Sequence, residues 1–549
     1  MAADSRKRRI LFCSEATYLN TGYATYAREV MNQFYKSGKY ELAEFASYGE
    51  LTDPRSSAIP WKFYPNSPDK DNPEELEQYH SRPTNQFGEW KFEQVLLDFL
   101  PDIVCDVRDF WMFDYQERSP FRRFFKWVIM PTVDAKPQNE QWLATYSNAD
   151  AVFNYSDWGY NVLLKEGNGK INCLGSAPPS ADPTYKPVED KRKHKEVMGF
   201  EPNTKIVGTV MRNQRRKLFP DLFCAFKKFL DISKKTDVYL YCHTSYPDIG
   251  WDIPKLINQY GLSSKVLFTY VCTDCQQAFP SYFSDARTKC VFCGAYKAGL
   301  SSVQKGVSYE YLTDIINAFD IYIQYANSEG FGLPQVEAAA CAVPVMSVDY
   351  SAMSSVIRNL DGEPLQVKTL YSELETGCDR AVPNNDYTAN KLKEFFDLSD
   401  DEMLKKGKET KQKFDTHYQW DKTSKVWMDY FDSVEIIPDE QSWGSPPRIF
   451  SPSKEPPEDL GAKAYVQWLI KNVLHEPELL NSYMESRMIR DLNYGFHIEG
   501  TGGSYFNEDS TYSARPNFEP FSKETAYNYM LERCMLRNFW EQKRQELAQ

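Results

Sequence analysis

The chain has 549 residues, and at about 150 residues per domain this length predicts three or four domains and excludes a single small module. Hydrophobic residues make up 42% and charged residues 26% of the chain, which is typical of a globular protein and excludes wholesale disorder. Acidic residues outnumber basic ones, 77 against 64, so the net charge of −13 provides no global positive field for a polyanion. Any contact with nucleic acid therefore has to be local.

The apolar segments are too short for a membrane protein. No run approaches the roughly 18 to 20 residues that a membrane span needs. The apolar stretch behind the basic N-terminus, residues 10–13, is also too short for the core of a signal peptide. We therefore expect a cytoplasmic protein without membrane contact.

Strand and helix patterns alternate from the N-terminus onward. Residues 9–13 are a short apolar run, residues 26–34 carry apolar side chains at helical spacing, and residues 40–45 have the pattern of a second strand. Further strand-like runs lie at 101–105, 127–130 and 151–154. This order predicts a parallel sheet with crossover helices that ends near residue 185. The Pro-, Asn- and Asp-rich residues 49–88 predict an irregular insertion.

A second alternating series begins after residue 189. It predicts strands at 205–208, 237–241, 266–268, 320–325 and 344–347, and helices at 219–230, 256–260, 309–318 and 334–342. The fold class is therefore α/β, with two doubly wound, Rossmann-like domains, residues 1–188 and 189–433, facing each other across a cleft. Ligands of such sheets bind at the carboxyl ends of the strands.

The pattern changes after residue 433. Six prolines between residues 438 and 457 predict a linker, and helical stretches follow near 462–474 and 523–546. We therefore expect residues 434–549 to form a separate linker and helical tail.

The most informative segment, residues 327–345, follows the strand predicted at 320–325. A glycine-containing turn leads there into a helix with Pro334 in its first turn. The free N–H groups and dipole of this helix start favour a phosphate or sugar oxygen. Glu329 in the turn and Glu337 inside the helix flank the same spot, and carboxylates suit sugar hydroxyls because each accepts two hydrogen bonds. The segment predicts a donor-binding site built from Glu329, Gly330, Phe331, Gly332, Leu333 and Glu337.

This segment resembles the motif of two glutamates separated by seven residues in retaining nucleotide-sugar glycosyltransferases of family 4, which have the two-domain GT-B fold. The resemblance implies that the C-terminal domain holds a UDP-, GDP- or ADP-linked sugar and that the N-terminal domain holds the acceptor. It also implies transfer of a hexosyl or pentosyl group by a retaining, front-face route without a catalytic metal. The first glutamate, Glu329, would contact the transferred sugar.

A basic segment after the strand predicted at 205–208 supports the same assignment. Arg212 and Lys217 resemble the family's Arg and, five residues on, Lys that bind the donor diphosphate. Two fixed cations at the leaving group stabilise the charge that develops as the glycosidic bond breaks. We therefore expect Arg212, Lys217 and Glu329 to be the catalytic residues, and we assign no role to Arg215 or Arg216.

Weaker resemblances extend from residue 10 to about residue 433. Residues 21–23 resemble the glycine turn of the N-terminal domain that faces the donor phosphate, which makes Gly22 a donor-binding candidate. Residues 420–431 resemble the C-terminal helix that crosses back onto the first domain. One position departs from the family, because Asp134 stands where a His is common. An ionised Asp cannot donate a hydrogen bond, so any contact of Asp134 with the donor sugar must differ, and its part in catalysis stays open.

Four of the twelve cysteines are clustered in two C-x-x-C pairs, Cys272 with Cys275 and Cys290 with Cys293, separated by 14 residues. This spacing is typical of a zinc ribbon in which four thiolates fill a structural zinc site. The pairs lie between the strand predicted at 266–268 and the helix predicted at 309–318. We expect a zinc knuckle, residues 270–295, inserted at the cleft end of the second domain.

With its knuckle and long tail, the chain resembles in layout the large glycosyltransferases of tailed bacteriophages. That resemblance implies the cytoplasm of a host cell and an acceptor such as a hydroxymethylated base in phage DNA, with the ribbon gripping nucleic acid. A carbohydrate or lipid-linked glycan acceptor is an alternative, and so is a non-catalytic protein of the same fold that binds nucleotide sugars or nucleic acid. The absence of a basic amphipathic helix disfavours a lipid acceptor more than a sugar. Donor identity and oligomeric state stay open.

Overall fold

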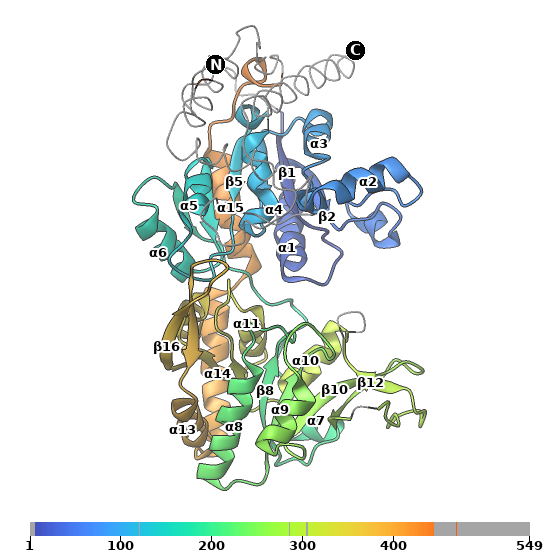
Figure 1. The fold of residues 1–549 in the computed structure, drawn as a ribbon, viewed down its shortest axis with the longest axis vertical. Helices are drawn as coiled ribbons and strands as arrows, with labels where there is room; N and C mark the ends of the chain where they lie inside the picture. Colours follow the sequence, from blue (N-terminus) through green and yellow to red (C-terminus); the bar gives the residue numbers. More distant parts are fainter. Residues whose placement is uncertain (1–5, 120, 285, 303–305, 444–467, 469–549) are drawn as a thin grey trace, which may run out of the picture.

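The computed structural model describes residues 6–119, 121–284, 286–302, 306–443 and 468. Two α/β domains follow each other along the long axis of the molecule (Figure 1). We call them the N-domain, built on strands β1–β7, and the C-domain, built on strands β8–β15. Among the described residues, no helix is both long and apolar enough to cross a lipid bilayer.

The N-domain contains a seven-stranded parallel sheet in the order β3-β2-β1-β4-β5-β6-β7. Its strands are Arg8–Glu15 (β1), Tyr40–Ser47 (β2), Lys62–Pro65 (β3), Ile103–Asp106 (β4), Lys126–Ile129 (β5), Ala151–Asn154 (β6) and Cys173–Ser176 (β7). Its helices are Gly22–Ser37 (α1), Pro73–Ser81 (α2), Phe92–Phe99 (α3), Phe110–Phe113 (α4), Glu140–Ser147 (α5) and Asp157–Glu166 (α6). The central strands are buried on both faces, as the near-continuous apolar runs of the sequence predict.

The segment 49–88 is more regular than expected. It contains α2 and also β3, which pairs in parallel with β2 at the edge of the sheet. The expectation of an irregular insertion is therefore wrong for these parts. An edge strand of four residues that ends in Pro65 is too short for a recognisable alternation, and an edge position tolerates proline.

The C-domain contains a sheet in the order β11-β10-β9-β8-β13-β14-β15, in which β10 also pairs with β12. Its strands are Lys205–Val210 (β8), Val238–His243 (β9), Val266–Cys272 (β10), Ala278–Tyr282 (β11), Ala298–Leu300 (β12), Ile321–Gln324 (β13), Val345–Val348 (β14) and Glu363–Leu365 (β15). The β10–β11 and β10–β12 pairs are antiparallel, and the remaining pairs are parallel. A separate hairpin consists of Val367–Ser372 (β16) and Asp379–Pro383 (β17).

The helices of the second half cover this sheet and return to the first domain. They are Lys191–Val197 (α7), Phe219–Ser233 (α8), Ile253–Tyr260 (α9), Tyr309–Asn317 (α10), Leu333–Ala340 (α11), Ala352–Asn359 (α12), Asn385–Phe396 (α13), Asp400–His417 (α14) and Trp420–Ser433 (α15). Helix α15 lies against the N-domain (Figure 1), where the Trp427 ring N–H donates to the Tyr26 hydroxyl at 2.8 Å. The expected return of the C-terminal helix is thus confirmed.

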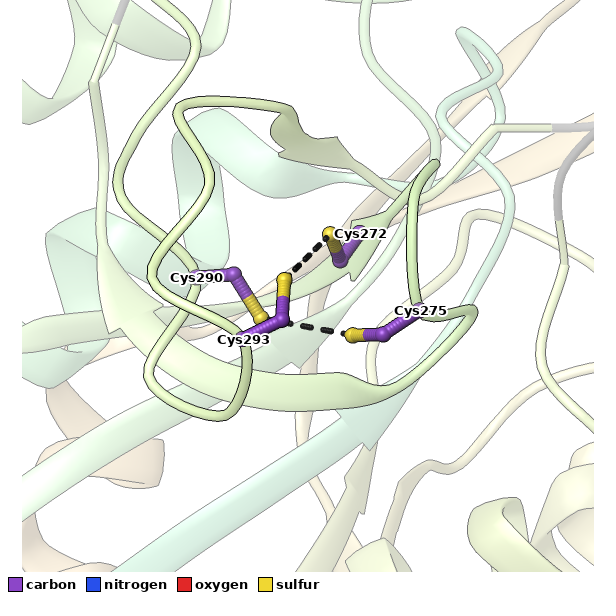
Figure 2. A group of neighbouring side chains, drawn as sticks. All are labelled: Cys272, Cys275, Cys290 and Cys293. Atoms are coloured by element: carbon purple, nitrogen blue, oxygen red, sulfur yellow. Dashed lines mark hydrogen bonds between the residues drawn. The ribbon is translucent and has the colours of Figure 1, made fainter.

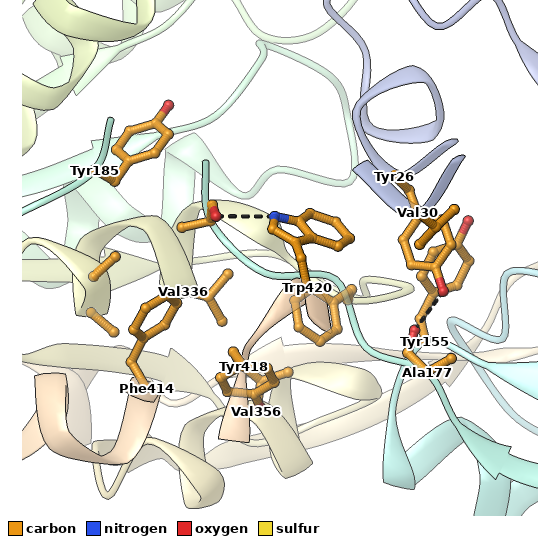
Figure 3. Close-up of a cluster of buried hydrophobic side chains, with 14 of the residues drawn as sticks. Tyr26, Val30, Tyr155, Ala177, Tyr185, Val336, Val356, Phe414, Tyr418 and Trp420 are labelled. Atoms are coloured by element: carbon orange, nitrogen blue, oxygen red, sulfur yellow. Dashed lines mark hydrogen bonds between the residues drawn. The ribbon is translucent and has the colours of Figure 1, made fainter. Parts of the chain in front are cut away.

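Buried aromatic side chains connect the two domains at this crossing (Figure 3). Tyr26 of the N-domain packs edge-on against Trp420 at 5.7 Å between ring centroids. The Trp420 ring N–H donates to the Ala181 carbonyl at 3.1 Å, and Tyr418 packs against Phe331 of the C-domain. One apolar cluster therefore spans both domains at the point where the chain crosses between them. The helices expected at 462–474 and 523–546 lie outside the described residues, apart from residue 468.

Candidate active site and metal centre

Two loops at the carboxyl ends of the neighbouring strands β8 and β13 are joined by backbone hydrogen bonds. Asn327 N–H donates to the Arg216 carbonyl at 2.9 Å, and Leu218 N–H donates to the Tyr325 carbonyl at 3.0 Å. Between them, Lys217 and Ala326 form an antiparallel bridge. This pairing brings the basic segment 212–217 against the turn that holds Glu329.

The Lys217 ammonium donates a short hydrogen bond to Glu329 Oε1. Gln324 Nε2 donates to the same oxygen at 2.9 Å, and both charged side chains are about nine-tenths buried, at 10% and 7% exposure. The main chain of Glu329 is held as well, because its N–H donates to Ser351 Oγ at 2.9 Å. Burial lowers the pKa of Lys217, and the nearby charge of Arg216 lowers it further. A phosphate placed beside Lys217 would favour its charged form.

Two arginines of this basic segment, Arg216 and Arg212, have different partners. Arg216 Nε lies 3.9 Å from Glu329 Oε2, with a half-exposed side chain. Arg212 instead makes a bidentate pair with Asp248 at 2.9 and 3.1 Å. The structure thus brings Lys217 and Glu329 together and adds Arg216, while Arg212 turns to another partner.

The turn before α11 approaches the N-domain closely. A Cβ atom at Gly330 would lie 2.4 Å from Thr132 Cγ2, so only glycine fits there. Gly332 has φ of 86°, in the left-handed region, and is the N-cap of α11. Glycine has no side chain to cap the helix, and Pro334 in the first turn has no N–H. The Gln335 N–H donates to the Gly332 carbonyl at 3.1 Å, so the Leu333 N–H is the donor of this first turn that is left for another acceptor. Phe331 and Leu333 pack into the apolar cluster, so their contribution to a ligand site is their backbone.

Glu337 lies in α11 and is buried, with 8% of its surface exposed. The pKa of Glu337 is raised to about 7, mainly because burial disfavours the ionised carboxylate. A hydrogen bond from the Tyr185 hydroxyl lowers this pKa, and the negative charge of Asp182 raises it. Glu337 is therefore a carboxyl group that exchanges its proton near neutral pH. A ligand that donates hydrogen bonds to it would favour the ionised form.

The N-domain contributes a carboxylate that the sequence analysis did not select. Asp109 follows β4, and burial raises its pKa, while hydrogen bonds from Tyr23 and Thr132 lower it. The Tyr23 and Thr132 hydroxyls are themselves 2.8 Å apart, and the positive charge of Arg216 acts on Asp109 from the C-domain. The carboxyl-end position after β4 is the one signal in the sequence that points to Asp109.

The two remaining predicted residues also lie on the N-domain. Gly22 begins α1, and a Cβ atom added there would meet nothing within 4 Å, so the turn has open space beside it. The Asp134 carboxylate lies 2.8 Å from the Arg380 guanidinium and accepts from Ser328 Oγ at 3.2 Å. Asp134 is thus engaged with the C-domain.

The four clustered cysteines converge at the end of β10 (Figure 2). All four Sγ atoms lie within 4.8 Å of one another. The Cys272–Cys293 and Cys275–Cys290 sulfur pairs are 3.7 and 3.6 Å apart. Four thiolates around zinc, with Zn–S bonds of about 2.3 Å, have S···S separations of about 3.8 Å, so the cluster fits a tetrahedral zinc ion.

In each C-x-x-C pair, a backbone N–H donates a hydrogen bond to the sulfur of the first cysteine. Asp274 N–H donates to Cys272 Sγ and Phe292 N–H donates to Cys290 Sγ, both at 3.4 Å. Such donors stabilise thiolates and orient them toward a metal. The two C-x-x-C loops therefore form a matched pair of knuckles.

Comparisons with known proteins agree with this geometry. Residues 283–389 match the family model "Glycosyl transferases group 1", a stretch that includes the turn 327–332 and Glu337. No curated protein sequence matches the chain at a significant level.

Solved structures resemble the chain over both domains. Sucrose-phosphate synthase of Thermosynechococcus elongatus has a TM-score of 0.55 at 15% identity, covering 78% of this chain and 100% of that one. A glycosyltransferase of Rickettsia africae has a TM-score of 0.53 at 14% identity, covering 78% of this chain and 98% of that one. Anabaena HepE, whose structure is a complex with UDP and glucose, also has a TM-score of 0.53 at 14% identity, covering 78% of this chain and 100% of that one. At this identity the likeness establishes the fold, which is GT-B.

Proposed function

We propose that the chain is a retaining glycosyltransferase that moves a sugar from a nucleotide diphosphate sugar to an acceptor hydroxyl. The observation that carries the proposal is the buried contact of Lys217 with Glu329 beside the start of α11, where Gly332 provides no side-chain cap. Glu329 and α11 lie within the glycosyltransferase family match, residues 283–389. A buried lysine, the neighbouring Arg216 and the start of a helix at one place suit a leaving diphosphate. Glu329 would contact the transferred sugar, as the resemblance to family 4 implies.

The donor diphosphate would lie between the basic segment and the start of α11. Lys217 and Arg216 would contact it directly. Arg212 remains part of the proposed site, but its guanidinium has to leave Asp248 to reach a phosphate. Gly22, beside open space on the N-domain, would face the same diphosphate, and Glu337 would accept from the ribose hydroxyls. We keep residues 1–188 and 189–433 as the proposed limits of the acceptor and donor domains.

Nucleotide binding is expected to release a proton near neutral pH. The free carboxyl of Glu337 has a pKa of about 7, and donation from the ribose hydroxyls favours its ionised form. Binding therefore lowers this pKa, so affinity should rise with pH up to about 7 and level off above it. Calorimetry at about pH 6.5 in buffers of different ionisation enthalpy measures the released proton. Equal proton release by wild type and Glu337→Gln would contradict the assignment.

The cysteine cluster is proposed to hold one structural zinc ion. Elemental analysis of protein prepared without chelators should find one zinc per chain, and Cys290→Ser with Cys293→Ser should remove it. Because the knuckle is inserted at the edge of the sheet, the thermal unfolding of the two main domains should persist in this variant. Finding no zinc in the wild type, or two per chain, would overturn the assignment.

The surface of this knuckle supports a nucleic acid as the acceptor. Val291, Phe292 and Tyr296 are 69%, 61% and 72% exposed, and the exposed cations Arg287 and Lys289 lie on the same insertion. Exposed rings with neighbouring cations suit bases and phosphates. We therefore propose a base of DNA carrying a hydroxymethyl group, as in the phage enzymes that the chain resembles, ahead of a carbohydrate acceptor.

The experiment that tests this function measures nucleoside diphosphate release from UDP-, GDP- and ADP-linked sugars. We expect the full chain to hydrolyse one donor slowly and to accelerate when DNA containing hydroxymethylated bases is added. Acceleration by an oligosaccharide and not by DNA would replace the acceptor. Binding of a nucleotide sugar without turnover under any condition would favour the non-catalytic alternative.

A further inference from the structure

The β16–β17 hairpin contacts both domains beside the proposed site. Asp379 N–H donates to the Lys136 carbonyl of the N-domain at 2.8 Å, and Cys378 Sγ lies 3.1 Å from the Pro137 carbonyl. On the opposite side, Ala381 N–H donates to the Asn327 carbonyl at 3.0 Å. Residues 378–381, at the start of β17, therefore lie between the N-domain segment 134–137 and the turn that precedes Glu329.

Arg380 is the central side chain of this strand. One of its terminal nitrogens, Nη1, donates to Asp134 Oδ2 at 2.8 Å and to Ser328 Oγ at 2.6 Å. Its other nitrogens, Nε and Nη2, donate to Glu373 of the same hairpin at 3.0 and 2.7 Å. The guanidinium thus joins an N-domain carboxylate to the residue directly before Glu329.

The arginine end of this contact is shielded from water, while its carboxylate partners Asp134 and Glu373 are 31% and 27% exposed. The Arg380 side chain is only 9% exposed, and Ser328 is fully buried. Surface pairs contribute little because water screens them, whereas a shielded guanidinium that donates to several partners fixes their relative geometry. The planar guanidinium spreads its donors over three nitrogens, so it holds Glu373 while it joins the two domains, whereas the lysine ammonium donates from a single nitrogen.

Resting on the proposed function, we propose that Arg380 is a positioning residue that couples docking of the two domains to the placement of Glu329. When the N-domain docks, Asp134 accepts a hydrogen bond from Arg380 Nη1. The same nitrogen donates to Ser328 and so holds the turn that carries Glu329. Asp134 stands where the family 4 enzymes that the chain resembles commonly have a His, and here it binds the Arg380 guanidinium of the C-domain.

Steady-state kinetics of donor hydrolysis tests this role with Arg380→Gln, Arg380→Lys and Asp134→Asn. We expect each to lower kcat about 10- to 100-fold while the donor KM changes less than about threefold, because misplacement by about 1 Å acts on the reacting geometry. Lysine should not rescue fully, since a single ammonium cannot hold Glu373 through two further nitrogens while it joins Asp134 to Ser328. The matched control is Arg192→Gln, which removes the exposed ion pair between Arg192 of α7 and Asp400 of α14. It should leave kcat unchanged.

A double-mutant comparison and hydrogen exchange separate coupling from simple loss of stability. Arg380→Gln should have little further effect in the Asp134→Asn background. In each variant, the amide of Asp379, which is bonded to Lys136, should exchange faster. Additive effects on kcat, or unchanged Asp379 exchange in Arg380→Gln, would overturn the proposal. If the wild type turns over no donor, the proposed function fails, and the exchange measurement still decides whether Arg380 couples the domains.

Discussion

Replacing Glu329 with glutamine is expected to lower donor turnover by about 10²- to 10³-fold, the size of effect seen when one preorganised transition-state contact is lost. The residue is fixed by contacts on every side, because Lys217 and Gln324 hold its carboxylate and Ser351 holds its main-chain N–H. Affinity for the bare nucleoside diphosphate should be retained or increase, since Lys217 is then free to meet a phosphate. Kinetics with the hydrolysed donor and calorimetry with the nucleotide measure the two effects separately.

Glu329→Asp sharpens the same test. It keeps the charge but withdraws the oxygens by about 1 Å, which is enough to misplace them relative to the sugar, so its turnover should also fall strongly. Glu337→Ala is the comparison variant and should instead weaken nucleotide binding. Near-normal turnover in both variants at position 329 would refute the catalytic role of this residue.

Replacing Lys217 with alanine should weaken nucleoside diphosphate binding by about 1.5 to 3 kcal/mol, the range for a charge-assisted hydrogen bond. The change also leaves the Glu329 carboxylate buried without its cation, so the free energy of unfolding should fall, by up to about 3 to 5 kcal/mol for a fully buried pair. Calorimetry and denaturant unfolding measure these two losses. The double variant Lys217→Ala with Glu329→Gln should regain most of the stability without regaining affinity.

The arginines of the same segment should differ in effect. Arg216→Ala should weaken nucleotide binding more than Arg212→Ala, because Arg216 lies beside Glu329 while Arg212 is paired with Asp248. Lys228→Ala, which removes only an exposed pair with Asp386, is the control. A larger loss for Arg212→Ala would show that its guanidinium moves to the diphosphate when the donor binds.

Local sequence was sufficient for the main features of the site. The strand, glycine turn and helix around Glu329 depend on residues that are neighbours in the chain, and the same is true of each C-x-x-C knuckle. Spacing alone did not reveal the direction of the side chains in the basic segment. The bridge between Lys217 and Ala326 decides that Arg216 and not Arg212 faces Glu329, and this bridge joins residues more than 100 positions apart.

The features missed by sequence reasoning all depend on contacts between distant segments. Asp109 acquires its surroundings from Tyr23, Thr132 and Arg216, which belong to three other parts of the chain. The partner of Asp134 lies on a hairpin 246 residues away. The edge strand β3 is similarly defined by pairing with β2 rather than by its own short pattern.

A structure of the full chain with the nucleoside diphosphate of its donor tests the central claim most directly. We expect the diphosphate beside Lys217 and Arg216, at the Leu333 N–H that begins α11, with the ribose hydroxyls at Glu337 and the vacant sugar position facing Glu329. A nucleotide bound anywhere else, with Lys217 still paired to Glu329 and the start of α11 free, would contradict it.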